Sequence, residues 1–242
     1  MIDLKGKRAF VTGGGRGIGH ATAVLLARAG AKVAVGYRSR KPAAEAHVVA
    51  AVRGDLGTPT GAHKAVAEAL RALGGGLDIL VINHGVWPPD DVPVAKMSDE
   101  QWESTRRANL DAVIYVCRAA IPSIRDGGTI VLVASTAGQR GEAFHTDYAA
   151  TKGAVISIAK SLAVELAPRI TVNCVAPGWV DTEMSTKPYA GDGRAAIEKT
   201  IPLRRVASAE DVAGPVVFLC SSLARHITGE ILNVNGGSVL CG

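Results

Sequence analysis

Aromatic residues are scarce in this sequence, since Phe, Trp and Tyr together make up 4% of the 242 residues. Long hydrophobic runs are missing as well, because no apolar stretch reaches the roughly eighteen residues that a membrane-spanning helix needs. The opening segment, Met1 to Arg8, also lacks the apolar core of a secretory signal peptide. These features argue against a membrane partner and predict a cytoplasmic protein.

Cysteine is also rare, with four residues spread along the chain at positions 117, 174, 220 and 241. They form no Cys-x-x-Cys pair and have no histidine-rich neighbourhood, which argues against a zinc site and against a disulfide framework. We therefore expect no metal and no disulfides. The cysteines are interpreted as small buried hydrophobic residues.

A concentrated charge of one sign is missing too. The formal net charge is +5, but the Lys and Arg residues are scattered and lie among acidic ones, which argues against a nucleic-acid partner. The chain has 48% hydrophobic residues and 28 glycines, a composition typical of a well-packed globular protein. We predict one domain over residues 1–242, with a cofactor half over about 1–135 and a catalytic and substrate half over about 135–242.

A glycine-rich turn near the start of the chain joins a predicted strand, Arg8 to Thr12, to a predicted helix, His20 to Ala29. Glycines allow a sharp turn and a close approach of the backbone to a pyrophosphate, whose negative charge then faces the N–H groups of the helix start. The spacing departs from Gly-x-Gly-x-x-Gly, because Ile18 stands at the sixth position counted from Gly13. The candidate cofactor contacts in this turn are Gly13, Gly15, Arg16, Gly17, Ile18 and Gly19.

The end of the next predicted strand, Lys32 to Tyr37, should meet the adenosine ribose of a dinucleotide. An NAD site usually carries Asp or Glu at this point, whereas this chain continues with Arg38-Ser39-Arg40-Lys41. Guanidinium groups bind phosphate through paired N–H donors, while a carboxylate would repel it. The sequence therefore favours NADP(H) bound through Arg38 and Ser39, with Arg16 near the same phosphate. NAD(H) binding and a merely solvated charged loop are the alternatives.

Strands and helices continue to alternate along the chain. A brief helix is expected after Pro42, followed by a third strand that ends at Asp55 and Leu56, beside the adenine. A helix over 60–73 and a fourth strand over 77–82 come next, and that strand ends at Asn83-His84-Gly85. This alternation predicts a parallel sheet covered on both faces, with ligands at the carboxyl ends of its strands.

A long helix is expected from Ser98 to about Ile124, with Asn109 in its middle. Asn is a poor residue for a helix interior unless its amide has a task, such as bonding to the backbone or holding a water molecule. The residues Gly127-Gly128 then predict a turn into a fifth strand over 130–134. Asn109 is therefore a candidate functional residue.

Three polar side chains follow that could act on one carbonyl group. Ser135 stands at the carboxyl end of the fifth strand. Tyr148 and Lys152 lie four residues apart in a predicted helix over 147–166, so they share one face and are one turn apart. A hydroxyl, a phenol and an ammonium are thus expected at the ligand edge of the sheet.

Taken together, these residues resemble the short-chain dehydrogenase/reductase family over essentially the whole chain. The resemblance implies an α/β fold, a Rossmann-type doubly wound parallel sheet of about seven strands with helices on both faces. It also implies a nicotinamide cofactor, no catalytic metal in most members and commonly a homotetramer. The matching motifs are Thr12-Gly13-x-x-x-Gly17-Ile18-Gly19, Asn83-x-Gly85, Asn109, Ser135, Tyr148-x-x-x-Lys152 and Pro177-Gly178.

The resemblance implies a role for each catalytic candidate. Tyr148 would protonate the carbonyl oxygen, and Lys152 would favour the phenolate and bind the nicotinamide ribose. Ser135 would hold the substrate oxygen and stabilise its developing charge. Asn109 would position a water molecule that relays protons to Lys152.

Further contacts follow from the same resemblance. Asn83 and Gly85 would steady the strand ends beside the cofactor, although His84 stands where the family has a small residue and is interpreted as structural. The residues beside the nicotinamide would be Pro177, Gly178, Val180 and Thr182, together with Tyr148 and Lys152. The candidate substrate contacts are Ser135, His145, Trp179, Met184 and Tyr189, and the irregular segment over 184–205 resembles a mobile substrate lid.

The predicted function is the NADPH-dependent reduction of a ketone or aldehyde, with overall similarity to 3-oxoacyl-carrier-protein reductases. A carrier-protein-linked substrate would need cations near the pocket mouth, and Arg125, Arg169, Arg204 and Arg205 are the candidates. A sugar or polyol dehydrogenase, similar to the glucose 1-dehydrogenases, is the alternative within the family. A non-catalytic cofactor-sensing protein on the same fold is the alternative of another class.

Overall fold

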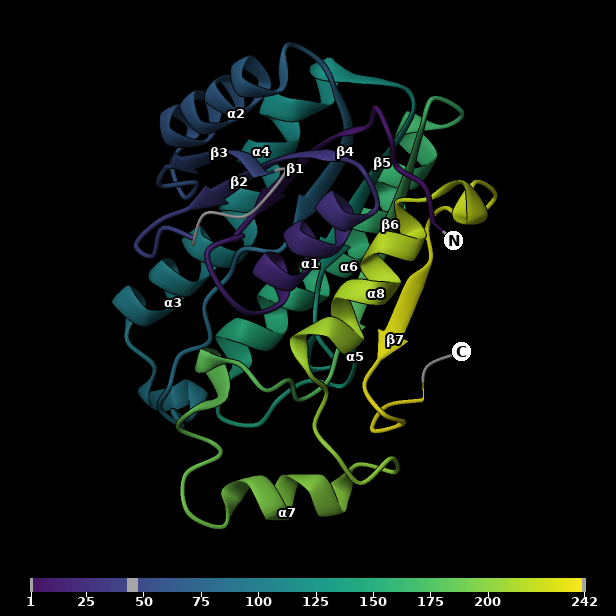
Figure 1. Cartoon of the computed structure of the whole chain (residues 1–242). Helices are drawn as coiled ribbons and strands as arrows, with labels where there is room; N and C mark the ends of the chain where they lie inside the picture. The colour runs from purple at the N-terminus through teal and green to yellow at the C-terminus, as the bar shows by residue number, and fades with distance from the viewer. Residues whose placement is uncertain (1, 43–47, 241–242) are drawn as a thin grey trace.

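The computed structural model describes residues 2–42 and 48–240 of the chain. Seven parallel strands form one sheet in the order β3-β2-β1-β4-β5-β6-β7 (Figure 1). The strands are β1 (Arg8–Thr12), β2 (Lys32–Tyr37), β3 (Val48–Arg53), β4 (Leu77–Ile82), β5 (Ile124–Val133), β6 (Ile170–Pro177) and β7 (Ile231–Val234). The predicted Rossmann-type α/β fold is confirmed.

Helices cover both faces of this sheet (Figure 1). They are α1 (Gly17–Arg28), α2 (Pro59–Leu73), α3 (Asp99–Arg106), α4 (Ala112–Ala120), α5 (Ala137–Arg140), α6 (Thr146–Leu166), α7 (Gly193–Thr200) and α8 (Ala209–Leu219). Helices α2, α4 and α6 pack on one face, and α1 and α8 pack on the other. No helix within the described residues is long and apolar enough to cross a membrane.

The sheet separates two hydrophobic cores because successive side chains of a strand point to opposite faces. In β4, Leu80 lies in the core under α2, α4 and α6, whereas its neighbours Ile79 and Val81 lie in the core under α1 and α8. All three are at most 1% exposed. This burial on both faces explains why the central residues of the strands are mostly apolar, without a polar residue at every second position.

The strand order reverses between β1 and β4, which are neighbours in the sheet although two strands separate them in the chain. The loops after these two strands therefore diverge to opposite faces and leave a crevice at the carboxyl edge, the usual ligand site of such sheets. Helix α7 lies beyond this edge, apart from the rest of the body (Figure 1). The position of the site thus follows from the topology.

The long helix predicted over 98–124 is wrong in two respects, because it is interrupted at Asn109 and ends at Ala120. Helix α3 ends at Arg106, a π-helical turn covers Arg107–Asp111, and α4 begins only at Ala112. The side chain of Asn109 bonds the backbone of Val86, accepting from its N–H at 2.7 Å and donating to its carbonyl oxygen at 2.9 Å. A π-helical turn within an α-helix often marks a functional position.

Two smaller predictions also differ from the structure. The fifth strand begins at Ile124 rather than near residue 130, and Gly127-Gly128 forms a bulge inside it instead of a turn before it. Gly127 has a φ of +76°, which glycine adopts without strain. The third strand ends at Arg53, just before Asp55. The brief helix expected after Pro42 falls on residues 43–47, which lie outside the described part.

Candidate active site

The glycine turn after β1 is built so tightly that side chains would not fit. A Cβ on Gly19 would lie 2.3 Å from the carbonyl oxygen of Gly13 and 2.4 Å from Asn83 Nδ2. Gly13 and Gly17 have φ values of +67° and +53°. The turn leads into α1, whose N-cap, Arg16, makes no side-chain capping bond. The helix start is therefore an available anion-binding end, as a dinucleotide pyrophosphate requires.

The loop after β2 closes one side of this turn. A Cβ on Gly15 would lie 2.2 Å from the carbonyl oxygen of Arg40, so the two backbones are in direct contact. Arg38, Ser39 and Arg40 all line the cleft. Arg16 Nη1 donates to Glu183 Oε2 at 2.8 Å, and Arg40 Nη1 donates to Glu183 Oε1. These hydrogen bonds hold the pKa of Glu183 below its usual value, Arg16 having the largest effect.

The end of β4 is tied to the glycine turn. Asn83 donates its side-chain amide to the carbonyl oxygens of Gly13 and Thr12, at 3.3 and 3.4 Å. His84 Nδ1 and the Thr12 hydroxyl are 2.8 Å apart. Burial, reinforced by the positive charge of Lys152, lowers the pKa of His84 to about 3, so the ring is neutral. These contacts favour the structural interpretation of His84.

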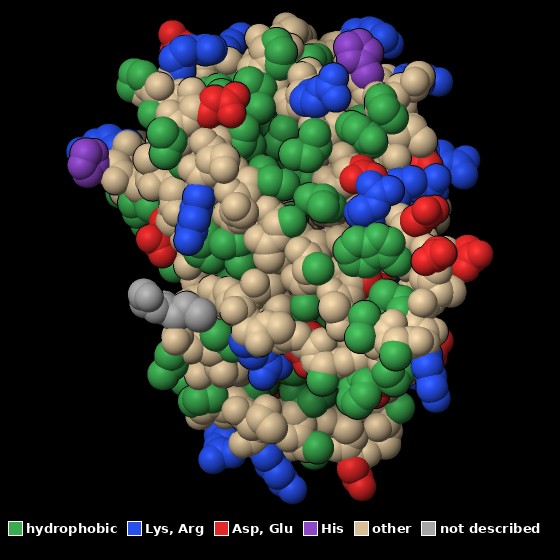
Figure 2. Space-filling view, turned by 180° about the vertical axis from the view of Figure 1, so that it is seen from behind, with side chains coloured by type: hydrophobic (Ala, Val, Ile, Leu, Met, Phe, Trp, Pro, Cys, Tyr) green, Lys and Arg blue, Asp and Glu red, His purple; other side chains and the backbone are tan. Residues whose placement is uncertain are grey.

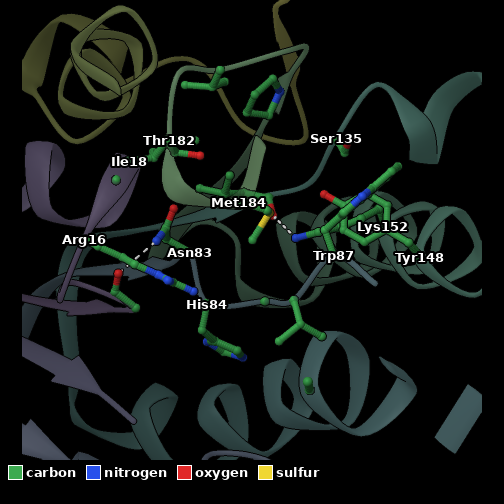
Figure 3. A pocket seen from close by; sticks show the side chains of 18 of the residues that line it. Arg16, Ile18, Asn83, His84, Trp87, Ser135, Tyr148, Lys152, Thr182 and Met184 are labelled. Atoms are coloured by element: carbon green, nitrogen blue, oxygen red, sulfur yellow. Dashed lines mark hydrogen bonds between the residues drawn. The ribbon is translucent and has the colours of Figure 1, made fainter. Parts of the chain in front are cut away.

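Three polar side chains meet at the far end of the cleft (Figure 3). Ser135 follows β5, and its oxygen accepts from the N–H of Ala137 at 3.2 Å. Tyr148 and Lys152 project from α6, with Lys152 Nζ 5.8 Å from the centre of the Tyr148 ring. The ammonium donates to the carbonyl oxygen of Val133 at 2.8 Å, which fixes it at the end of β5.

Gly85 and Asn109 lie behind this group. A Cβ on Gly85 would lie 3.1 Å from Asn109 Oδ1 and 3.4 Å from Lys152 Nζ, so only glycine leaves both groups undisturbed. Asn109 is fully buried and does not line the cleft itself. Its amide is occupied by the backbone of Val86 and by the Thr151 hydroxyl at 3.3 Å. It therefore fixes the loop that carries Gly85.

Comparisons with known proteins bear on this arrangement of residues. The sequence model of a family described as "Enoyl-(Acyl carrier protein) reductase" matches residues 13–238. The chain is 38% identical to the 3-oxoacyl-[acyl-carrier-protein] reductase of Escherichia coli strain K12, over 98% of each chain. The corresponding enzyme of Aquifex aeolicus is also 38% identical, over 98% of each chain.

The chain belongs to the short-chain dehydrogenase/reductase family. A solved family member from Brucella melitensis, described as a glucose/ribitol dehydrogenase, superposes with a TM-score of 0.90 at 32% identity and covers 99% of each chain. A short-chain dehydrogenase from Burkholderia cenocepacia in complex with NADP has a TM-score of 0.87 at 34% identity, covering 97% of this chain and 98% of that one. The chain is thus an NAD(P)-dependent oxidoreductase of this family.

Burial dominates the protonation of the two titratable groups in this short-chain dehydrogenase/reductase. It raises the pKa of Tyr148 to about 12, against the effect of a hydrogen bond with Ser135. It lowers the pKa of Lys152 to about 8. Desolvation is the largest influence on the phenol pKa in the protein without cofactor, so the lowering of this pKa by the Lys152 ammonium stays a prediction for the complex. Tyr148 is a protonated acid at neutral pH.

Aromatic rings form a row from the phenol toward the lid. The edge of Trp87 meets Tyr148 with ring centres 4.6 Å apart, Trp179 follows at 6.3 Å from Trp87, and Tyr189 packs on Trp179 at 5.9 Å. Trp179 and Met184 line the cleft as expected for substrate contacts. His145 is 4% exposed and lies behind Trp87, whose ring centre is 3.9 Å away. His145 and Tyr189 therefore support the wall rather than line it.

Most of the predicted cofactor contacts line one continuous cleft. Gly19 is the exception, because it is buried beneath the turn and acts by leaving room for Gly13. The predicted contacts that line the cleft are Gly13, Gly15, Arg16, Gly17, Ile18, Arg38, Ser39, Asp55, Leu56, Asn83, Gly85, Tyr148, Lys152, Pro177, Gly178, Val180 and Thr182.

Two of the carboxylates that line the cleft were not predicted from the sequence. Glu142 and Glu183 both line the cleft, and each pairs with an arginine there. No spacing rule identifies either residue. The available signal for Glu183 was its position directly after Thr182, at the end of the segment expected to pass the nicotinamide.

The arginines proposed for a carrier protein are not grouped at the cleft. Arg125 lies at the start of β5 and Arg169 just before β6, so both stand at the amino edge of the sheet, opposite the site. Arg169 pairs with Asp126 at 2.6 Å. Arg205 pairs with Asp211 and Arg204 donates to the carbonyl oxygen of Lys199. The expectation that Arg125 and Arg169 stand near the pocket mouth is therefore wrong, because both lie at the opposite edge of the sheet from the cleft of the same chain.

Asp147 anchors the start of α6 next to Tyr148. Its carboxylate is fully buried and accepts from the Thr105 hydroxyl at 2.9 Å and from Gln101 Nε2 at 3.2 Å, both on α3.

The Asp147→Ala change leaves these two donors unpaired, so we expect a loss of about 2–3 kcal/mol of folding free energy, seen as a lower Tm. Asp126→Ala, at an exposed ion pair, is the control and should change Tm little; equal effects of the two would contradict the role of Asp147.

Proposed function

We propose that this protein reduces a ketone or aldehyde carbonyl to an alcohol with NADPH as the hydride donor. The observation that carries the proposal is the convergence of Ser135, Tyr148 and Lys152 at one end of a cleft whose other end holds the glycine turn and Arg16 (Figure 3). Bound NADPH supplies a hydride, and the protein must supply a proton and hydrogen-bond donors that hold the carbonyl oxygen.

The cofactor fits the residues present. The glycine turn leaves no room for side chains and points a helix start at the cleft, which suits a pyrophosphate. The adenosine 2′-phosphate would be held by Arg16 together with Arg38, Ser39 and Arg40 of the loop after β2, and the nicotinamide half by Pro177, Gly178, Val180 and Thr182. Complexes of relatives contain NADP and NADPH, the latter in a blue fluorescent protein from a metagenomic library, 33% identical over 98% of this chain with a TM-score of 0.88. These points support NADP(H) over NAD(H).

The acid–base chemistry follows from the protonation states. Tyr148, with a pKa of about 12, holds its proton at neutral pH and can give it to the carbonyl oxygen as negative charge develops there. Ser135 donates a second hydrogen bond to the same oxygen. Lys152, charged below about pH 8, offsets the charge left on the phenol oxygen. Asn109 acts here by holding Val86 and the loop with Gly85; the water relay remains a prediction.

The substrate class that we propose is a 3-oxoacyl compound. The relatives named 3-oxoacyl-[acyl-carrier-protein] reductases support it, and the apolar side chains of Trp87, Trp179 and Met184 in the cleft wall suit an acyl chain. The glucose/ribitol dehydrogenase description of the Brucella melitensis relative keeps a polyol dehydrogenase as the second candidate. The presence of Ser135, Tyr148 and Lys152 argues against a non-catalytic sensor.

A substrate panel tests the proposal. NADPH oxidation would be followed at 340 nm with acetoacetyl-coenzyme A, a 3-oxoacyl carrier-protein thioester, simple ketones and aldehydes, with NADH in parallel. NADP reduction would be followed with glucose and ribitol. We expect the highest kcat/KM for a 3-oxoacyl thioester with NADPH. Turnover of the sugars alone would favour the second candidate, and comparable kcat/KM with NADH would contradict the cofactor preference.

A homotetramer is the assembly that we propose. Ile114 on α4 is 37% exposed and Val164 on α6 is 82% exposed, and hydrophobic side chains gather across the middle of the face opposite the viewer of Figure 1, with charged ones mostly toward its rim (Figure 2). Such a surface is suited to contact with another copy of this chain. Light scattering after size-exclusion chromatography would measure the mass, and a monomer would contradict the proposal. The cytoplasmic location stays a prediction.

A further inference from the structure

Glu183 stands where the lid segment meets the cofactor cleft. It follows Thr182 directly, and its side chain reaches the glycine turn and the loop after β2. Oε2 accepts from Arg16 Nη1 at 2.8 Å, and Oε1 accepts from Arg40 Nη1. One anionic group therefore joins two cations that come from different loops.

Backbone packing brings the three segments together. The Arg40 carbonyl oxygen lies 2.2 Å from the position of a Cβ on Gly15, and Thr182 Cγ2 lies 3.2 Å from that of a Cβ on Gly17. The loop after β2 and the root of the lid thus both rest on the glycine turn. Because the two guanidinium groups are placed by this packing, they can converge on one anion in the cleft.

A 2′-phosphate needs the same surroundings that Glu183 has. Residues 37–42 include no carboxylate, and guanidinium groups bind phosphate as readily as they bind carboxylate. A phosphate and the Glu183 carboxylate would repel one another between the same two cations. The side chains of Arg16, Arg40 and Glu183 are 54, 63 and 48% exposed, so their ion pairs are weak and are readily exchanged.

We propose that Glu183 is a specificity-determining residue of the cofactor site, whose carboxylate occupies the 2′-phosphate position between Arg16 and Arg40 and leaves when NADPH binds. It therefore weakens the binding of 2′-phosphorylated cofactors selectively. NADH has no group at this position and binds with the two ion pairs intact. The inference rests on the proposed NADP(H) site and is independent of the carbonyl substrate.

The test is direct binding to the Glu183→Gln variant, which keeps the side-chain length and removes the charge. The dissociation constants of NADPH and NADH would be measured by fluorescence titration, and that of adenosine 2′,5′-bisphosphate by calorimetry, all without carbonyl substrate. We expect NADPH and the bisphosphate to bind about three- to tenfold more tightly than to the unmodified protein. NADH should change less than twofold, because it does not displace Glu183.

Controls separate this effect from a general change in charge. Glu198→Gln removes an ion-paired carboxylate on α7 that does not line the cleft, so all three constants should stay the same. In an Arg40→Ala background, the gain from Glu183→Gln should shrink, because one of the two cations is gone. Glu183→Ala is the second variant and should act in the same direction.

Several results would overturn the proposal. An unchanged or weaker affinity of Glu183→Gln for the bisphosphate would mean that Glu183 holds the arginines in place for the phosphate instead of competing with it. Equal gains for NADH and NADPH would show a change unrelated to the 2′-phosphate. An unmodified protein that binds NADH as tightly as NADPH, and does not bind the bisphosphate, would instead overturn the NADP(H) assignment itself.

Discussion

Replacing Tyr148 with Phe is expected to lower kcat for carbonyl reduction by about a thousandfold, because the substituted ring has no proton to give to the carbonyl oxygen. The ring of Phe keeps the edge contact with Trp87, 4.6 Å between ring centres in the unmodified protein, so the wall of the cleft should persist. The dissociation constant of NADPH should change by less than about threefold. Stopped-flow or steady-state NADPH absorbance measures the rate, and fluorescence titration measures the binding.

The control for this change is Tyr115→Phe, which removes a phenol on α4 from a side chain packed beside the hydrophobic core. Its kcat should remain within about twofold of the unmodified value, and its Tm should show that the loss of a phenol oxygen is tolerated. If Tyr148→Phe kept its kcat, the proton would have to come from another group or from water, and the proposed role of Tyr148 would be lost.

The sheet could be predicted from the sequence because its strands are buried on both faces. A run such as 77–82, apolar except for Asp78 and bounded by glycines before it and by Asn83 after it, predicts a buried strand, and its predicted limits match β4. Parallel strands then place their polar end residues on one edge. The grouping of Ser135 with the glycine turn followed from this rule alone.

The interruption of the helix at Asn109 could not be predicted in the same way. Residues 99–120 contain no Gly or Pro that would interrupt a helix, and the π-helical turn coincides with a bond from Asn109 to Val86, which lies 23 residues away in the chain. The Glu183 contacts, 167 residues from Arg16 and 143 from Arg40, are of the same kind. Long-range hydrogen bonds of single polar side chains have no signature in local sequence patterns.

Protonation states were equally inaccessible to sequence reasoning. The four-residue spacing of Tyr148 and Lys152 suggests an ammonium that stabilises a phenolate, yet both side chains are less than 8% exposed. Desolvation penalises the charged form of each group, so it raises the pKa of Tyr148 and lowers the pKa of Lys152. The extent of burial depends on Trp87 and on the loops around α6, which only the folded structure supplies.

Replacing Lys152 with Met should lower kcat/KM at pH 7 by about a hundredfold or more, because no positive charge remains to offset the negative charge on the Tyr148 oxygen. The pH dependence of kcat/KM gives a second and more specific prediction. Since the pKa of Lys152 is about 8, kcat/KM of the unmodified enzyme should fall as pH rises through that value, whereas Tyr148, at about 12, does not titrate in this range. Lys152→Met should lack this alkaline fall between pH 6 and 10.

The same substitution should not destabilise the fold. An unfolded chain binds the Lys152 proton with a pKa near 10.4, so burying the charge costs roughly 3 kcal/mol below pH 8, and this cost shrinks as pH rises from about 8 to about 10.4. A buried Met avoids it, and Tm at pH 7 should stay equal or rise. Lys160→Met, at an exposed position on α6, should change neither activity nor pH profile. An alkaline fall that survives in Lys152→Met, or a marked drop in its Tm, would show that Lys152 serves the fold rather than the chemistry.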